Sequence, residues 1–173
     1  HYDIIMEKID WADSVVLGPG LGRNPSTQIL IKKLVSNIKK PIVLDADGLY
    51  PFSNNIEILC QRDSPLIITP HMTELARLLG CKEEMILSDF SNVMKGFRKK
   101  YKQVCMVKQV PACILFENSI RINTTGNPGL ASAGTGDVLT GIIASLVSQG
   151  LNCYDAASVG AYLHGQTSDE LVE

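Results

Sequence analysis

The stretch Ser14-Val-Val-Leu-Gly-Pro-Gly-Leu-Gly22 leads through one arginine into the pair Asn24-Pro25. A short apolar run is followed here by a glycine-rich turn and then by a helix start. Asparagine is a good N-cap, and proline suits the first helical position because its missing N–H needs no partner there. Apolar residues then recur at helical spacing from Leu30 to Ile38. The stretch therefore predicts one strand-turn-helix unit of an α/β fold.

The same alternation continues along the chain. Further apolar strands are predicted at 41–44, 66–69 and 104–107, and helices at 3–9, 56–60, 73–79, 88–101, 138–148 and 154–172. Strands that are apolar throughout indicate a parallel sheet with helices over both faces. The segments 112–116 and 120–123 instead predict an antiparallel hairpin. We therefore expect one α/β domain over residues 1–173, a mostly parallel sheet flanked by helices with the hairpin added at its edge.

Length, charge and cysteine usage exclude several classes of protein. The chain has 173 residues, a net charge of −2 and 45% hydrophobic residues, which is ordinary for a single globular domain. The basic spots at 39–40 and 98–100 are short, which indicates solvated faces rather than a nucleic-acid site. No apolar run approaches membrane-spanning length, and no signal peptide is recognisable. The cysteines have no metal or redox spacing, which favours a reducing, cytoplasmic location.

Polar and glycine-rich residues follow each predicted strand at the point where it ends. They are Gly18–Gly22, Asp45–Gly48, Thr69–Glu74 and Lys108. In open α/β sheets, ligands bind outside the carboxyl ends of the strands. We therefore expect these segments to share one rim of the sheet and to form the functional site.

A second glycine-rich segment, Asn127-Pro-Gly-Leu-Ala-Ser-Ala-Gly-Thr-Gly-Asp137, runs into the helix expected at 138–148. Gly134 and Gly136 allow a sharp turn and the close approach of a ligand. The amides of residues 135–137 would face one point at the positive end of the helix dipole, where phosphate is the usual ligand. A carboxylate beside it suggests phosphoryl transfer, with Asp137 accepting the proton of the attacking hydroxyl. The alternative is a glycine turn in which Asp137 only starts the helix.

The other rim residues each have a functional and a structural interpretation. Asp45 and Asp47 could hold Mg²⁺ through water or bind a ligand, or Asp47 could cap a helix. His71 could donate to a ligand or switch charge near neutral pH, with Glu74 orienting it or approaching a hydrated metal, or the two could simply start a helix. Lys108 could meet a phosphate, or it could be a solvated strand-end lysine. His164, within the last helix, is expected to be a packed or exposed helix residue.

Four of these segments occur in an order that is specific, although each segment alone is not. Gly18-Pro-Gly-Leu-Gly22, Asp45-Ala-Asp-Gly48, Thr69-Pro-His-Met-Thr-Glu74 and the segment 127–137 together resemble the nucleotide-dependent NAD(P)H-hydrate dehydratases, a branch of the ribokinase-like superfamily. The resemblance covers nearly the whole chain. Family members extend further at the amino end, so the chain resembles the carboxyl-terminal two thirds of the domain and opens at His1 in the middle of a pattern. We expect residues 1–173 alone to be inactive and to aggregate or bind a partner fragment.

The resemblance implies a repair reaction. Such enzymes phosphorylate the ring hydroxyl of hydrated NADH or NADPH from ADP or ATP, and phosphate then leaves; the form of the loop resembles bacterial-type members, which use ADP. By position, Asp137 is then the catalytic base, and the hydrate binds at Gly20, His71, Asp45, Asn127 and Asp137. The nucleotide is implied at Lys108, Gln109, Val110, Pro111, Ala112, Thr135 and Gly136. Mg²⁺ is also implied, held through water at Glu74, Asp45 or Asp47, as is a homo-oligomer with a tetramer favoured.

One segment departs from the family pattern. The family usually has Lys-Gly, a small residue, Gly and Thr where this chain has Lys108-Gln-Val-Pro-Ala112. The change removes backbone flexibility and a hydroxyl donor at the edge of the nucleotide, so the nucleotide preference stays open. Two other functions also stay open. One is a small-molecule kinase of the same superfamily, such as a vitamin kinase, and the other is a truncated domain that binds nucleotide without catalysis.

Overall fold

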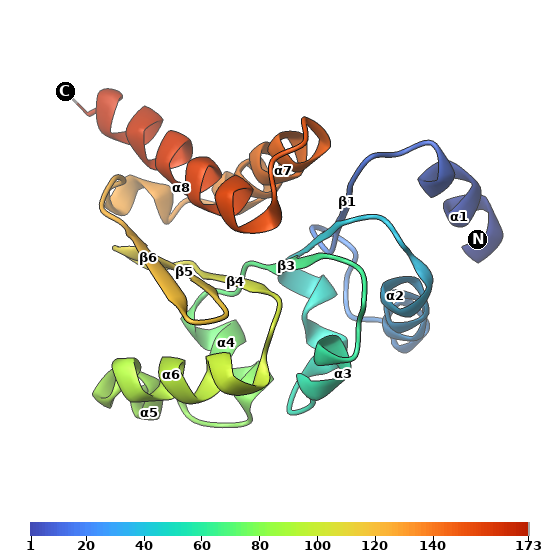
Figure 1. The fold of residues 1–173 in the computed structure, drawn as a ribbon, viewed down its shortest axis with the longest axis horizontal. Helices are drawn as coiled ribbons and strands as arrows, with labels where there is room; N and C mark the ends of the chain where they lie inside the picture. The colour runs from blue at the N-terminus through green and yellow to red at the C-terminus, as the bar shows by residue number, and fades with distance from the viewer. Residues whose placement is uncertain (173) are drawn as a thin grey trace.

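Six strands form one sheet whose order in space follows their order in the sequence (Figure 1). In the computed structural model, which describes residues 1–172, they are β1 Val15–Leu17, β2 Ile42–Leu44, β3 Leu66–Ile68, β4 Val104–Val107, β5 Ala112–Phe116 and β6 Ser119–Asn123. Strands β1 to β4 pair in parallel, whereas β4, β5 and β6 pair antiparallel. The predicted parallel sheet with an edge hairpin is confirmed.

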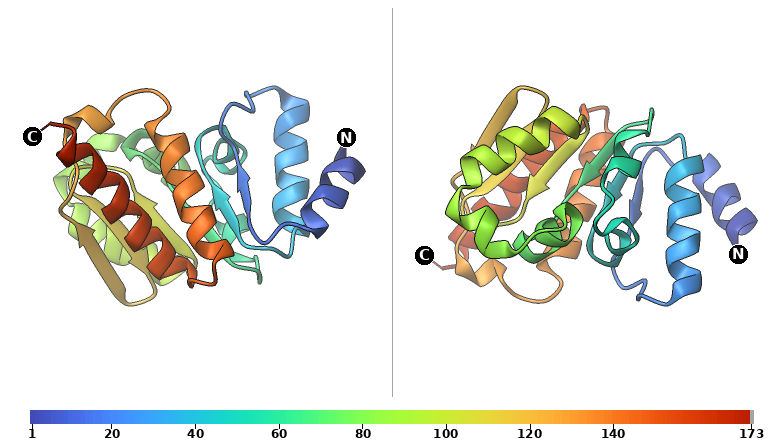
Figure 2. Two further views of the ribbon diagram at one scale, coloured as in Figure 1. Left: turned by 90° about the horizontal axis from the view of Figure 1, so that it is seen from above. Right: turned by 90° about the horizontal axis from the view of Figure 1, so that it is seen from below.

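Helices cover both faces of this sheet. On one face, α7 Thr135–Ser148 and α8 Cys153–Glu170 lie side by side (Figure 2). The other face carries α2 Pro25–Asn37, α3 Glu57–Cys60, α4 Met72–Leu79, α5 Glu83–Ser88 and α6 Phe90–Lys100. At the amino end α1 Tyr2–Asp10 packs beside α2, where Lys33 Nζ lies 3.8 Å from the centre of the Tyr2 ring. The expected helices on both faces are confirmed.

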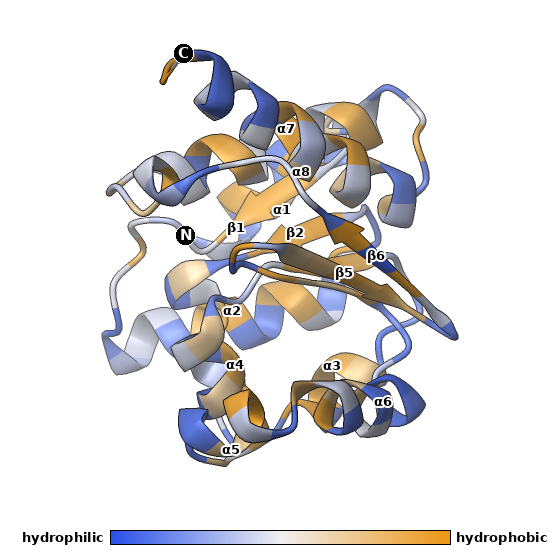
Figure 3. Cartoon of the chain, turned by 90° about the vertical axis from the view of Figure 1, so that its left-hand side faces the viewer, coloured by the Kyte–Doolittle hydropathy of each residue, from blue (hydrophilic) through white to orange (hydrophobic). Residues whose placement is uncertain are grey.

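Side chains alternate between two cores along each strand. Val43 and Ile67 belong to the core under α7 and α8, whereas their neighbours Leu44 and Ile68 belong to the core against α2 to α6. Both faces of a central strand are thus removed from water, so its residues are apolar at every position rather than at every second one. Figure 3 shows hydrophobic strands enclosed between helices of mixed hydropathy.

One helix was not predicted, and one predicted helix start is wrong. The helix expected over 88–101 is α6 Phe90–Lys100, whose N-cap Asp89 accepts a hydrogen bond from the Asn92 amide, and the short helix α5 Glu83–Ser88 before it is an addition. Helix α7 begins at Thr135, earlier than the predicted Val138. Its N-cap is Gly134, whose φ of 89° ends the preceding turn in a conformation that favours glycine. The glycine-rich segment therefore already contributes the first turn of the helix.

Strand β1 lies at the edge of the sheet within the described residues. It pairs only with β2 there, although its apolar run from Ser14 is of the kind found inside a parallel sheet. Val16 is accordingly 38% exposed. Helix α7 braces the strand, since the Ser14 hydroxyl donates to the Ala144 carbonyl at 2.9 Å. The side of β1 away from β2 is an open sheet edge.

Candidate active site

A cavity of about 350 Å³ opens where the end of β4, the hairpin, α7 and α8 meet. Its volume is in the range of small-molecule sites. Its wall contains most of the residues that the sequence predicted for binding: His71, Lys108, Gln109, Val110, Ala112, Asn127, Thr135 and Gly136. Gly20, Asp45, Pro111 and Asp137 lie outside this wall. The predicted convergence of separate segments on one rim is confirmed.

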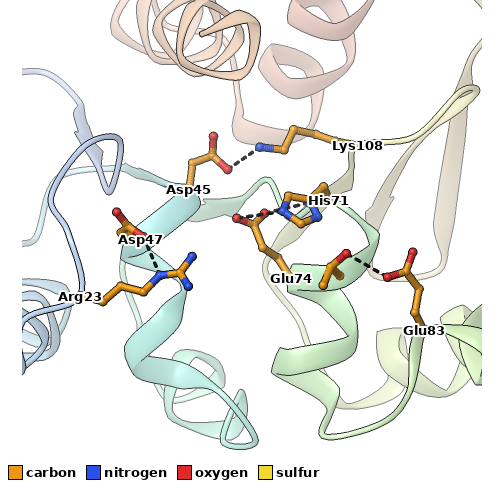
Figure 4. Close-up of polar contacts among 8 residues, drawn as sticks. Arg23, Asp45, Asp47, His71, Glu74, Glu83 and Lys108 are labelled. Atoms are coloured by element: carbon orange, nitrogen blue, oxygen red, sulfur yellow. Dashed lines mark hydrogen bonds and ion pairs between the residues drawn. The ribbon is translucent and has the colours of Figure 1, made fainter. Parts of the chain in front are cut away.

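A buried ion pair ties the ends of β2 and β4 together (Figure 4). Lys108 Nζ donates to Asp45 Oδ1 at 2.6 Å, and the Asp45 side chain is 1% exposed against 21% for Lys108. A carboxylate removed from water needs such a partner, because an unpaired buried charge is costly. The interpretation of Lys108 as a solvated lysine is therefore wrong. Its ammonium group is held within the site.

Asp45 also brings the two glycine-rich segments together. Gly18, with φ 135°, packs so closely that a Cβ there would lie 1.7 Å from the Asp45 carbonyl oxygen. On the other side, a Cβ on Gly136 would lie 3.5 Å from Lys108 Nζ and 3.8 Å from Asp45 Oδ2. Only glycine fits at position 18, because any side chain would collide with backbone. The turn after β1, the ion pair and the start of α7 are thus adjacent.

His71 and Glu74 begin helix α4. One Glu74 oxygen accepts a hydrogen bond from the His71 amide at 3.0 Å, and the other lies 3.4 Å from His71 Nε2. Figure 4 shows the two side chains facing each other. The Glu74 side chain is 8% exposed, whereas that of His71 is 51% exposed. These contacts form the capping box of α4, so they fit both the interpretation of Glu74 as orienting His71 and that of a helix start. The imidazole is held at the cavity wall, where it can face a ligand.

Asp47 secures the glycine-rich turn that follows β1. Its carboxylate accepts hydrogen bonds from the Gly22 amide at 3.0 Å and from Arg23 Nε at 2.9 Å (Figure 4). Asp47 lies inside the 3-10 turn Ala46–Gly48 and does not cap it, so the interpretation as a helix cap is wrong. The side chain instead closes a loop between two neighbouring strand ends.

The three carboxylates considered as water-mediated metal ligands already have cationic or imidazole partners. Asp45 binds Lys108, Asp47 binds Arg23, and Glu74 lies against His71. Within residues 1–172, no three His, Cys, Asp or Glu side chains gather as a metal-binding group. The donor set therefore does not fit a Mg²⁺ ion that the protein holds directly.

The segment 127–137 is less open than the sequence predicted. The Thr135 amide donates to the Ser132 carbonyl at 3.4 Å, and the Asp137 amide donates to the Gly134 carbonyl at 3.1 Å. Of the three amides expected to face one point, only that of Gly136 has no protein acceptor among the described residues. The left-handed turn at Gly134 folds the chain back on itself, so the amides of Thr135 and Asp137 donate to carbonyl groups of the same turn. What remains of the predicted anion site is the Gly136 amide at the positive end of the helix dipole, with Lys108 alongside.

Asp137 occupies the first turn of α7, directly after a residue of the cavity wall. Its side chain is exposed, and it is not part of that wall. The helix is anchored behind it, because the Thr140 hydroxyl donates to the Asp137 carbonyl at 2.8 Å. A carboxylate in this place can accept a proton from a molecule bound beside the cavity rather than inside it.

Asn127 is committed to shaping the loop. Its Oδ1 accepts from the Gly129 amide at 2.9 Å, and its Nδ2 donates to the Ser168 carbonyl at 2.9 Å and to Asp169 Oδ1 at 3.1 Å. Both hydrogens of the side-chain amide are therefore used within the chain. Direct substrate binding by Asn127 stays a prediction, and its observed contacts join the loop to α8.

Sequence reasoning missed part of the cavity wall. Asn123, Thr125 and His164 also line it, so His164 is not an ordinary helix histidine. Burial lowers the pKa of His164, and a hydrogen bond with the Thr135 backbone acts in the opposite direction. The sequence contained one signal: Ala161 and His164 stand three residues apart, which puts them on one helix face. Which face of α8 meets the loop after β6 depends on tertiary packing, which the local sequence does not show.

The cysteines are structural. All five are free thiols, and Cys105 and Cys113 are buried in the strands, as predicted. Burial raises the pKa of the Cys60, Cys105, Cys113 and Cys153 thiols, which keeps them protonated and poorly nucleophilic near neutral pH. These thiols are therefore poor candidates for a nucleophile.

One family profile matches the chain from end to end: that of NAD(P)H-hydrate dehydratase, over residues 1–173. The chain belongs to the NAD(P)H-hydrate dehydratase family. The resemblance drawn from four ordered segments is thereby confirmed.

Named relatives and solved structures agree with this family. The bifunctional NAD(P)H-hydrate repair enzyme Nnr of Moorella thermoacetica is 41% identical over 169 residues, which are 97% of this chain and 32% of that enzyme. The ADP/ATP-dependent NAD(P)H-hydrate dehydratase of Bacillus subtilis, co-crystallised with ATP/Mg²⁺, has a TM-score of 0.78 at 28% identity, over 95% of this chain and 60% of that one.

A ribokinase-like superfamily protein from Enterococcus faecalis has a TM-score of 0.82 at 28% identity, over 98% of this chain and 59% of that one. The fold of the dehydratase-family chain is therefore ribokinase-like. The chain spans less than two thirds of the length of each of these three proteins.

Proposed function

We propose that the protein dehydrates hydrated NADH or NADPH, with ADP or ATP as the phosphoryl donor. The observation that carries the proposal is the meeting of Lys108 and Gly136 at one cavity wall, with Asp137 directly beyond it. An ammonium group and a helix N-terminus suit phosphate, and a neighbouring carboxylate suits an alcohol that must lose its proton. Family membership supplies the class of reaction that needs both.

The nucleotide is assigned to the cavity. Val110, Ala112 and Leu139 give the wall an apolar surface that suits a purine ring, while Lys108 and the Gly136 amide suit the phosphates. Val110 is 66% exposed and can cover a base from outside. Val110 stands where the family usually has a small residue, and Ala112 stands where it usually has a threonine. Both ADP and ATP are compatible with such a wall, and the resemblance to bacterial-type members favours ADP.

The chemical step is assigned to Asp137. Its carboxylate accepts the proton of the ring hydroxyl as that oxygen attacks the terminal phosphorus of the nucleotide. Lys108 and the Gly136 amide stabilise the negative charge on the transferred phosphoryl group. The phosphorylated ring then loses phosphate and a ring proton, and the double bond returns. Phosphate leaves far more readily than hydroxide, which is why a nucleotide is consumed.

Magnesium enters this proposal only as the usual companion of nucleotide phosphates. The carboxylates of Asp45, Asp47 and Glu74 are engaged with protein partners. We therefore assign no step to a protein-held ion.

The hydrate is assigned to the region beside the turn Gly18–Gly22. A Cβ on Gly20 would meet nothing within 4 Å, so a flat ring has room there. His71 is oriented by Glu74 and can donate to the ring amide from the other side. The proton acceptor Asp137 then lies between the assigned hydrate and the cavity. The role of Asp137 is tested by the Asp137→Asn variant described below.

The domain is proposed to be larger than the described residues. The open edge of β1 and the 38% exposure of Val16 both indicate a strand that another strand would cover. The relatives, whose own chains are longer, support the same idea. We propose that further chain pairs with β1 in the whole protein and completes a ribokinase-like domain around the hydrate.

Assembly and location follow from the same family assignment. A homo-oligomer is proposed, with a tetramer favoured by the resemblance, and light scattering of the whole protein tests it. A cytoplasmic location is proposed because all five cysteines are free thiols. Within residues 1–172, no helix has both the length and the hydropathy needed to cross a membrane.

The test is an assay on the whole protein with hydrated NADH and either ADP or ATP. The proposal predicts that absorbance of the reduced nicotinamide returns while AMP, or ADP when ATP is the donor, and phosphate accumulate. A small-molecule kinase would instead leave the phosphate attached to an organic product. Nucleotide binding without any product would indicate the non-catalytic alternative.

A further inference from the structure

The segment between β6 and α7 is supported chiefly by the last helix. It leaves the sheet after Asn123 and supplies Thr125, Asn127, Pro128, Leu130 and Ser132 to the cavity wall. The Asn123 Nδ2 group donates to the Ala161 carbonyl of α8 at 3.1 Å, and the Thr125 hydroxyl donates to the Tyr162 carbonyl at 3.1 Å. The first residues of the loop are thus laid along α8 from its middle turn onward.

Closer to the end of α8, the contact becomes too tight for any side chain. A Cβ on Gly165 would lie 2.3 Å from the Thr125 hydroxyl and 2.7 Å from its backbone. Gly165 is buried, and its missing side chain lets the loop backbone touch the helix. The helix surface therefore fixes where the loop runs.

The strongest contact is made by Asp169, in the last turn of α8. Its Oδ2 accepts from the Gly126 amide at 2.8 Å, and its Oδ1 accepts from Asn127 Nδ2 at 3.1 Å. Both carboxylate oxygens are used, and both donors belong to the start of the same loop. Hydrogen bonds to a charged acceptor are stronger than those between neutral groups. Gly126 has φ 103°, so its amide is held in a conformation that favours glycine.

We propose that Asp169 is a positioning residue for nucleotide binding: its carboxylate holds the loop 126–132 against α8 and so keeps the cavity wall in place. The proposal rests on the assignment of the nucleotide to this cavity. It assigns Asp169 no contact with substrate. Without its acceptors, the Gly126 amide loses its partner and Asn127 Nδ2 keeps only the Ser168 carbonyl. The start of the loop is then held less tightly to α8, and the wall that follows it is less well fixed. Asp137 stands on α7 beyond this segment and keeps its place.

The test compares Asp169→Ala with Asp155→Ala in the whole protein. Asp155 is a matched control, because it lies on the same helix and its carboxylate bonds to Arg121 at 2.6 Å, away from the loop. For Asp169→Ala we expect the Kd for ADP to rise about tenfold, the usual scale for losing charge-assisted hydrogen bonds. The turnover at saturating ADP should stay within about twofold, because the base is untouched. Asp169→Asn keeps one acceptor oxygen, so its Kd for ADP should lie between those of Asp155→Ala and Asp169→Ala.

Hydrogen exchange of the peptide that contains Gly126 gives a readout independent of catalysis. Exchange there should accelerate in Asp169→Ala and remain slow in Asp155→Ala. A variant that melts at a lower temperature but keeps the wild-type Kd and slow exchange would overturn the proposal. A wild-type protein that binds no ADP would refute the proposed function and the nucleotide part of this inference, whereas the exchange data would still show whether Asp169 holds the loop.

Discussion

The hairpin side of the rim and the β1 side differ in how much of the chain supports them. On the hairpin side, Lys108 is paired with a carboxylate that is 1% exposed, and Gly136 lies against this pair. Two helices, α7 and α8, back the cavity wall and fix its loop through side-chain hydrogen bonds. This side is assembled wholly from the described residues.

On the β1 side the support is thinner. The turn Gly18–Gly22 is tied by Asp47 and Arg23, and Leu21 within it is 42% exposed. The strand that carries the turn has an open edge. The difference teaches that, under the proposed function, the two substrates have unequal needs. The proposed nucleotide side is built within this chain, whereas the hydrate side is proposed to depend on chain that pairs with β1. Changes on the hairpin side should therefore act on nucleotide binding and stability directly.

The largest effect is expected from Lys108→Met. It leaves Asp45 buried without a cation, which typically costs about 3–5 kcal/mol. For a domain of this size, the lower figure corresponds to a fall in Tm of about 6–12 °C. Thermal unfolding of the whole protein measures it. The double variant Asp45→Asn with Lys108→Met removes both charges and should recover much of the loss. An unchanged Tm in Lys108→Met would show that the pair does not hold the two strand ends together.

Asp137→Asn should separate chemistry from folding. Asparagine also suits a helix start, so the fold and the ADP affinity should be kept. Loss of the base should lower turnover by about a hundredfold or more, which is the usual value of a positioned acid–base group. Steady-state kinetics with hydrated NADH checks this. Near wild-type turnover would exclude Asp137 as the base, and the proton of the ring hydroxyl would then need another acceptor.

Gly136→Val sharpens the assignment of the phosphates. A Cβ at this position already lies 3.5 Å from Lys108 Nζ, and two further methyl groups would fill the space before the free amide. Calorimetry with ADP should show affinity reduced by about tenfold or more, a change of about 1.4 kcal/mol. Gly141→Val on the same helix is the control, because a Cβ there meets nothing within 4 Å. Equal affinities for the two variants would place the phosphates elsewhere.

The smallest effect is a pH dependence from His164. Burial lowers its pKa from the ordinary value of 6.5, so the unfolded chain binds the proton more readily than the folded one. The contribution of His164 to stability is therefore complete above about pH 6.5 and is lost as the pH falls below it. The fall in Tm between pH 7.5 and pH 5.5 should be smaller in His164→Gln than in the wild type. Identical falls would mean that His164 titrates as it does in water.

Much of the fold was predictable because its signals are local. The strands at 42–44, 66–68 and 104–107, the hairpin turn and the glycine that ends α4 all follow from apolar runs and turn residues. Rim residues such as Lys108 and His71 were predictable because parallel strands end on one side of a sheet. Helix α5 was missed because its 6 residues span less than two helical turns, too few to show a helical spacing of apolar residues.

The unpredicted part of the site is tertiary. Nothing near Asp47 in the sequence shows that it reaches Gly22, and nothing near Asp169 shows that it reaches Gly126. Likewise, the amides of Thr135 and Asp137 were expected to be free, and a turn that starts the helix earlier uses them. These contacts depend on how distant segments meet. Local patterns place a residue on an element but do not show its partner.

The most direct test of the central claim measures the ratio of the products that the whole protein forms. Hydrated NADH and ADP are mixed with the enzyme, and the recovered NADH, the AMP and the free phosphate are each measured in the same sample. The account predicts one AMP and one phosphate for every NADH recovered, because the phosphoryl group passes to the ring and then leaves. Recovery of NADH without consumption of ADP, or AMP formation without free phosphate, would contradict it.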